Sequence, residues 1–191
     1  MQKLKLFGIT SILLLGLIVN STASAATIRC EFIPHATLCN VMLSSKPEEF
    51  VKALGKPNAI IKLRNDRIGY TYGNSSSIEK FMLTFRDGHL VEIRSWLSNP
   101  NVDFWMDLMD TSDIDFYLNK IKVLKQKRSM IESLDAGITL SDADEFSENR
   151  IFQGCPISLF YESSGLGFTV KSGDYESYRS TAVIIPIDQC S

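Results

Sequence analysis

The chain has 191 residues, of which 45% are hydrophobic and 22% are charged, with 20 basic and 22 acidic side chains. This composition is that of an ordinary globular protein, and it excludes disordered, collagen-like and coiled-coil chains. The net charge of −2 argues against a general nucleic-acid binder.

The first 25 residues have the pattern of a secretory signal peptide, cleaved after Ala25. Lys3 and Lys5 form its positive start, residues 6–19 are apolar, and small residues precede the cleavage site. The segment carries no acid, so its removal changes the net charge from −2 to −4. No later stretch has the roughly 18 apolar residues of a transmembrane helix. Residues 26–30 form no lipobox, so we expect a periplasmic or secreted protein without a lipid anchor.

Four cysteines follow the predicted cleavage site: Cys30, Cys39, Cys155 and Cys190. Export places them in an oxidising compartment, where an even number of cysteines indicates disulfides. Of the three possible connectivities, we favour Cys30–Cys39 with Cys155–Cys190, because cysteines close in sequence usually meet first. Metal binding through cysteine is not expected, since the spacings lack the tight pairs of zinc sites.

A helix and an antiparallel sheet are expected after the first cysteine pair. Ser-Lys-Pro-Glu-Glu-Phe at 45–50 reads as a capping box and predicts a helix that ends at Gly55. Alternating apolar side chains then predict strands near 68–72, 81–85 and 89–96.

The turn between the last two of these strands decides which residues face each other. A three-residue loop, Arg86-Asp87-Gly88, with Gly88 in the left-handed region pairs Leu83 with Val91 and Phe81 with Ile93. Because this register keeps the apolar side chains on one face, we expect it to form.

The middle of the chain predicts a long helix over residues 113–134. Ile114, Leu118, Ile121 and Leu124 would form its apolar stripe.

Segments of the second half repeat patterns of the first half in the same order, which favours a duplication. Residues 141–146, 158–161 and 168–173 repeat the patterns at 45–50, 69–72 and 83–88. Each copy then reads as a helix followed by antiparallel strands, the later strands lying near 157–161, 166–171 and 181–187.

These elements predict an α+β fold of tandem helix-plus-antiparallel-β-sheet units, joined by a long helix and stabilised by disulfides. The first unit spans residues 26–100, the connecting helix lies within 101–136, and the second unit spans 137–191.

The first unit resembles the SmpA/OmlA (BamE-like) family of small periplasmic envelope proteins. The resemblance lies in Leu54-Gly55-Lys56-Pro57, in the tyrosines Tyr70 and Tyr72, and in residues 83–90. A tandem pair of such units is similar in plan to the β-lactamase inhibitory protein-like superfamily. This resemblance implies a concave sheet that is presented to a protein target, and it assigns no functional residue.

Four aromatic residues are candidate protein-binding residues, since aromatic side chains near a concave sheet often anchor interfaces. They are Tyr70, Tyr72, Trp96 and Trp105.

No catalytic residue, metal or cofactor is predicted. Motifs at 77–80, 147–149 and 171–173 match those of penicillin-binding proteins in order, but the chain is too short for that fold. The acidic run at 103–115 lacks the glycine and the closing glutamate of a calcium loop.

A basic run in the predicted middle helix indicates an alternative partner, an anionic lipid or lipopolysaccharide. The run consists of Lys120, Lys122, Lys125, Lys127 and Arg128.

Together these observations predict a non-catalytic binding protein of the cell envelope, which recognises another protein through a sheet face, as an inhibitor or as a plain binder. One alternative is an envelope hydrolase whose site is assembled only by the fold. The other is the anionic lipid or lipopolysaccharide binder.

Overall fold

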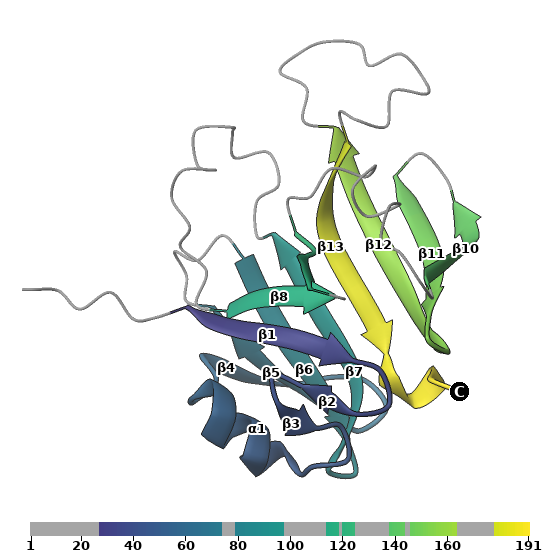
Figure 1. Ribbon diagram of the computed structural model, residues 1–191. Coiled ribbons are helices and arrows are strands. Elements are labelled where there is room, and N and C mark those ends of the chain that lie inside the picture. The colour runs from purple at the N-terminus through teal and green to yellow at the C-terminus, as the bar shows by residue number, and fades with distance from the viewer. Residues whose placement is uncertain are drawn as a thin grey trace, which may run out of the picture.

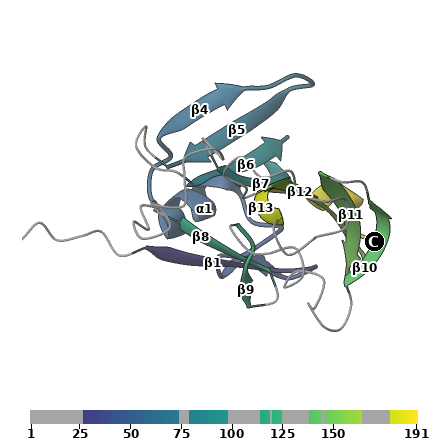
Figure 2. The same cartoon turned by 90° about the horizontal axis from the view of Figure 1, so that it is seen from above.

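Figure 1 shows the computed structural model, which describes residues 27–73, 79–97, 114–118, 120–124, 138–143, 146–163 and 178–191. These residues form two β-sheets, the helix α1 (Pro47–Leu54) and a short 3-10 helix, η3 (Ile187–Gln189). Figure 2 shows that α1 and the smaller sheet lie on the same side of the larger sheet.

The smaller sheet is built from five strands: β1 (Ile28–Ile33), β2 (Thr37–Leu38), β3 (Val41–Met42), β8 (Ile114–Leu118) and β9 (Ile121–Lys122). They lie in the order β3-β2-β1-β8-β9. β1 and β8 are parallel, with Cys30 opposite Phe116 and Phe32 opposite Leu118. All four side chains are buried. Because side chains alternate along a strand, these apolar residues share one face of the smaller sheet.

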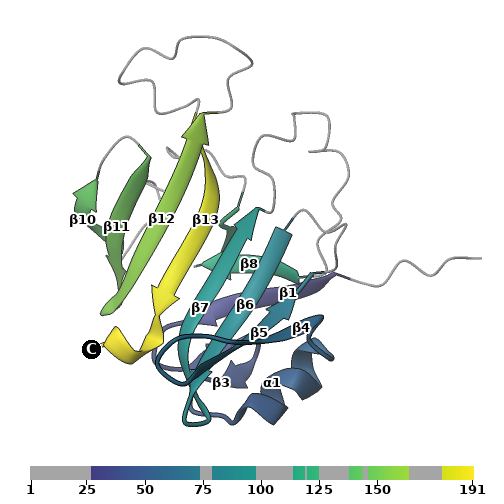
Figure 3. The same cartoon turned by 180° about the vertical axis from the view of Figure 1, so that it is seen from behind.

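The larger sheet is built from eight strands: β4 (Ala59–Lys62), β5 (Arg67–Tyr72), β6 (Glu79–Arg86), β7 (His89–Leu97), β10 (Ile138–Ala143), β11 (Ser147–Phe152), β12 (Cys155–Ser163) and β13 (Tyr178–Pro186). Their order is β10-β11-β12-β13-β7-β6-β5-β4, and each neighbouring pair is antiparallel. The last strand of the chain, β13, lies against β7 (Figure 3). Strands from both halves of the chain therefore share one sheet.

Aromatic side chains fill the space between the helix and the two sheets. Phe50 of α1 packs on Phe85 with 5.6 Å between ring centroids, and Phe81 of β6 packs on Phe116 of β8 at 5.7 Å. All four rings are buried. Burial of a phenylalanine side chain contributes about 1.5–3 kcal/mol, so these contacts hold α1 and the smaller sheet over one face of the larger sheet.

The predicted α+β fold of tandem units joined by a long helix is wrong. Where the sequence indicated a helix over 113–134, the described residues form β8 and β9. Ile114, Phe116 and Leu118 are buried and alternate with the half-buried Asp115 and Tyr117, which is the period of a strand. Phe116 was not part of the apolar stripe predicted for the helix, and its burial is explained by a strand and not by that helix. Residues 101–113 and 125–137 lie outside the described residues.

The predicted internal repeat is also wrong. The first copy does form a helix, α1, which begins with Pro47 and ends at Leu54. Gly55 is its C-cap, and a φ of 83° there suits glycine. Its N-cap is Lys46, without the side-chain hydrogen bond of the predicted capping box. Residues 141–143 of the second copy instead belong to β10, which pairs with β11. The domain boundaries stay a prediction.

The predicted register of the β6–β7 hairpin is corrected as well. Asp87 and Gly88 form a two-residue turn, both with positive φ, and Arg86 faces His89. A register shift after Thr84 then places Leu83 opposite Ile93. The sheet keeps its apolar face through this irregularity rather than through a longer loop.

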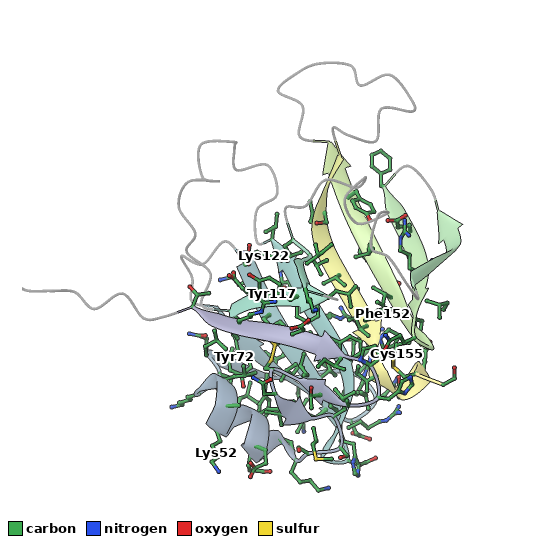
Figure 4. All side chains as sticks on the ribbon, in the orientation of Figure 1. Lys52, Tyr72, Tyr117, Lys122, Phe152 and Cys155 are labelled. Carbon is green, nitrogen blue, oxygen red and sulfur yellow. A yellow bond between two sulfur atoms is a disulfide. The ribbon has the colours of Figure 1, made fainter. Side chains whose placement is uncertain are left out.

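Two disulfides hold the ends of the described chain. Cys30 is joined to Cys39, and Cys155 at the start of β12 is joined to Cys190, which follows η3. This is the pairing that the sequence favoured. Figure 4 labels Cys155 near the C-terminus. Within the described residues no helix is long and apolar enough to cross a membrane, and the predicted signal peptide lies outside them.

Candidate functional site

The two faces of the larger sheet differ in what covers them. Phe81, Leu83 and Ile93 point toward α1 and the smaller sheet and are buried. The alternation of a strand therefore turns Met82 and Arg94 to the other face. Figure 3 views the sheet from that side, and no described helix lies over β6, β7 or β13 there. We call this the outer face.

A groove of about 400 Å³ runs across the outer face. It crosses β4, β5, β6, β7 and β13, and its lining is mostly apolar. Five adjacent strands can line one hollow only if the sheet is curved, and Figure 2 shows β4 and β5 turned away from the plane of β7 and β13. The groove is lined by Ile61, Thr71, Met82, Arg94, Ser95, Trp96, Ala182, Val183 and Ile184.

A glycine in β5, Gly69, leaves room for the side chains of its neighbours Met82 and Ile61 at the floor of the groove. A β-carbon at Gly69 would lie 2.9 Å from Met82 Sδ and 3.0 Å from Ile61 Cγ1. These two side chains therefore meet over β5 in space that any other residue would occupy. Glycine in a strand interior is unfavourable in itself, so its presence here is explained by this close packing.

The polar side of the groove is a set of paired charges. Arg94 donates from Nε to Glu92 Oε1 at 2.5 Å and from Nη2 to Glu92 Oε2 at 3.1 Å. Thr84 Oγ1 donates to Glu92 Oε1 at 3.3 Å, and Arg67 Nη1 lies 3.9 Å from Glu92 Oε2. One carboxylate therefore lies against both guanidinium groups, which positions Arg94 and leaves this set of three charged side chains with one excess positive charge.

The structure separates the four predicted aromatic residues. Trp96 lines the groove. Tyr70 lies on the opposite face, where its ring packs on Phe85 at 5.1 Å between centroids. Tyr72 is 3% exposed and packs near Phe81. Trp105 lies outside the described residues.

Tyr72, one of the tyrosines buried in the core, has a raised pKa. Burial raises the pKa of Tyr72 to about 12, and the neighbouring Tyr70 adds to this rise. Within the described residues the Tyr72 hydroxyl has no hydrogen-bond partner. Figure 4 labels Tyr72 next to β1, and its ring lies 6.3 Å from that of the buried Phe81 between centroids. Tyr72 therefore belongs to the core and does not reach the groove.

The basic residues proposed for anionic lipid occupy different environments. Lys122 Nζ lies 2.6 Å from Asp115 Oδ1 and 3.6 Å from Glu79 Oε1, and its side chain is only 20% exposed. Lys120 is exposed, and its backbone N–H donates to Glu31 Oε1 at 3.0 Å. Lys125, Lys127 and Arg128 lie outside the described residues. Lys122 thus serves an internal ion cluster that joins the two sheets.

Sequence reasoning missed every groove residue except Trp96; the missed residues are Ile61, Thr71, Met82, Arg94, Ser95, Ala182, Val183 and Ile184. One signal was present, because assigning Phe81, Leu83 and Phe85 to the inner face already places Met82 on the outer face. Among the described residues, no three histidine, cysteine or acidic side chains are placed to hold a metal ion.

The chain matches no protein-family model and no curated protein. Two solved structures are similar to it: a cysteine-rich secretory protein from Staphylococcus aureus and an extracellular protein containing an SCP domain from Bacillus anthracis. Each shares 8% identity and a TM-score of 0.43. The matches cover 75% and 77% of this chain and 44% of each of those chains. A likeness at this level assigns no family.

The predicted resemblance to SmpA/OmlA proteins and to the β-lactamase inhibitory protein is wrong. Its residues lie at the end of α1 and in β5, β6 and β7. These three strands belong to one sheet with β13 rather than to a separate unit. The motif Leu54-Gly55-Lys56-Pro57 marks only the end of a helix.

Proposed function

We propose that this protein is an exported, non-catalytic binding protein that holds an apolar segment of another protein in the groove on its outer face. The observation that carries the proposal is the mostly apolar groove of about 400 Å³ across five strands, with Trp96 in its lining.

The proposal of export draws on the sequence and on the disulfides. Residues 1–25 have the pattern of a signal peptide. All four cysteines are paired in the structure. Disulfides persist mainly in the periplasm and outside the cell, so a periplasmic or secreted location explains both features.

The shape of the groove favours a segment of a protein over a compact small molecule. Five strands, spaced about 4.8 Å apart, span roughly 19 Å. An extended peptide rises about 3.3 Å per residue, so about six residues would cross the groove. Apolar side chains on alternate positions would then reach the lining, and polar ones would face water.

The lining residues favour the same kind of partner. Tryptophan, methionine and arginine are enriched in protein interfaces compared with the rest of a protein surface. Trp96, Met82 and Arg94 all line the groove. Arg94 is paired with Glu92, so its guanidinium group is held in place beside the apolar lining.

The proposal is tested by selecting short random peptides, displayed on phage, on the mature disulfide-bonded protein. Peptides enriched in apolar and aromatic residues are expected, and their affinities are measured by calorimetry. Ile184 lines the groove. We expect Ile184→Lys to weaken binding at least about tenfold, or 1.4 kcal/mol, because it places a charge where an apolar side chain must bind.

A matched control makes the same chemical change elsewhere. Ile33 is 47% exposed on β1, in the smaller sheet. Ile33→Lys should leave peptide affinity unchanged, and circular dichroism should show that both variants fold. Failure to enrich any peptide whose binding depends on Ile184 overturns the proposal.

A further inference from the structure

The strand β4 forms one edge of the larger sheet, and its side chains are unusually apolar for such a place. All four residues of β4 are exposed, with Ile60 at 62% and Ile61 at 40%. Natural proteins protect edge strands with charges, prolines or bulges. Lys62 is the sole charged residue of β4, and no described strand lies beyond it.

The hydrogen bonds of β4 show which backbone groups face outward. Leu63 N–H donates to Arg67 O at 2.8 Å, so this pair is a hydrogen-bonded pair of the β4–β5 ladder. Such pairs alternate along an antiparallel ladder. Ile61 therefore bonds toward β5, and the N–H and C=O groups of Ile60 and Lys62 point away from the sheet.

We propose that a second copy of this chain pairs with β4, antiparallel and about a two-fold axis at Ile61. Ile60 of each copy then faces Lys62 of the other as a hydrogen-bonded pair, and the two Ile61 side chains face each other on the outer face. This register uses all the outward N–H and C=O groups of Ile60 and Lys62 in both copies.

The neighbouring registers are less favourable. A register centred on Lys62 would place two ammonium groups opposite each other, which destabilises a strand pair. A register centred on Ile60 would place Lys62 opposite Asn58. The Asn58 N–H already donates to Thr71 O at 2.8 Å, so it is not available to the second copy.

This pairing would also change the groove. Ile61 lines the end of the groove at β4, and in the pair it contacts its counterpart on the same face of a continuous sheet. The second copy thus supplies a side chain to that end of the groove. The inference rests on the backbone of β4 and not on the proposed function, because the outward N–H and C=O groups of β4 are the same whether or not the groove binds a peptide.

The test is sedimentation velocity of the mature, disulfide-bonded protein over a wide range of concentrations. We expect a reversible monomer–dimer equilibrium. Ile60→Lys should weaken dimerisation at least about tenfold, because it places a second ammonium opposite Lys62. Ile60→Glu should keep or strengthen the dimer, since its carboxylate would face Lys62 of the other copy.

The two variants separate the proposed register from other forms of association. Both change an exposed side chain, so both should fold, as circular dichroism would verify. A wild-type protein that stays monomeric at all concentrations overturns the inference. Equal disruption by Ile60→Lys and Ile60→Glu, or no effect of either, also overturns it. Peptide binding in the groove, measured on the Ile60→Lys monomer, reports on the proposed function separately.

Discussion

The ion cluster that joins the two sheets allows a sharp test of the fold. Lys122 of β9 lies between Asp115 of β8 and Glu79 of β6, at 2.6 and 3.6 Å. The side chain of Glu79 is 3% exposed and that of Asp115 is 17% exposed. Replacing Lys122 by methionine keeps most of the packing volume but leaves two carboxylates in a poorly hydrated place without their shared cation.

The expected loss of stability follows from this burial. Removing one partner of a buried ion pair destabilises a protein by about 3–5 kcal/mol, because the remaining charge stays in a poorly hydrated place and loses that partner's attraction. Lys122 keeps 20% of its side-chain surface exposed, so we expect Lys122→Met to lie at the lower end, at about 3 kcal/mol.

The assay is equilibrium unfolding in urea with the disulfides intact, followed by circular dichroism. Glu79→Gln in the Lys122→Met background removes the charge of the more deeply buried of the two carboxylates that Lys122 contacted. The double variant should therefore recover at least about 1 kcal/mol relative to additive losses. A loss below about 0.5 kcal/mol for Lys122→Met, or additive losses in the double variant, would refute this account of the cluster.

Three further predictions concern other parts of the fold. The bridge between Cys155 and Cys190 closes a separation of 35 residues, so replacing both by alanine should lower the unfolding free energy by about 4 kcal/mol in chemical denaturation. Gly154 has a φ of 83°, and an added β-carbon would overlap the Ser191 carbonyl oxygen. Gly154→Ala should therefore lower the free energy of unfolding by about 1–3 kcal/mol, which would be measured as a lower melting temperature. An unchanged melting temperature would contradict this. Burial raises the pKa of Tyr72 to about 12, whereas that of an unfolded tyrosine is about 10, so the unfolded chain loses this proton at lower pH and the stability should fall as the pH rises between these values. Below pH 12 the folded wild type and Tyr72→Phe should show the same tyrosinate absorbance in the ultraviolet, because Tyr72 is still protonated there.

Local patterns predicted the parts of the fold that depend on near neighbours. Alternation in 68–72 and 81–85 predicted the strands that the structure shows as β5 and β6, and Gly55 predicted the end of α1. The disulfide pairing followed from closeness in sequence. The strands and the end of the helix depend on about ten neighbouring residues. The disulfide pairing depends on the lower loss of chain entropy when cysteines close in sequence are joined. Both kinds of information are contained in a single sequence.

The remaining parts depend on contacts between distant segments. Residues 114–118 carry apolar side chains that are compatible with a helix or a strand. Pairing with β1, which is distant in sequence, stabilises the strand. β13 reaches β7 in the same way. The groove could not be predicted because Ile61 and Ile184 are brought together only by the order of five strands. Of the aromatic candidates for protein binding, Trp96 lines the groove, whereas Tyr70 and Tyr72 face the other layer, and a binding role for any of them stays a prediction.

The most direct test of the central claim is photocrosslinking in the cells that produce the protein. p-Benzoylphenylalanine replaces either Trp96, in the groove, or Lys52, exposed on α1 on the other side of the larger sheet. We predict that illumination yields an adduct with a distinct protein from position 96 only, and that Ile184→Lys abolishes this adduct. Identical adducts from both positions, or none from position 96, would contradict the claim that the groove binds a protein.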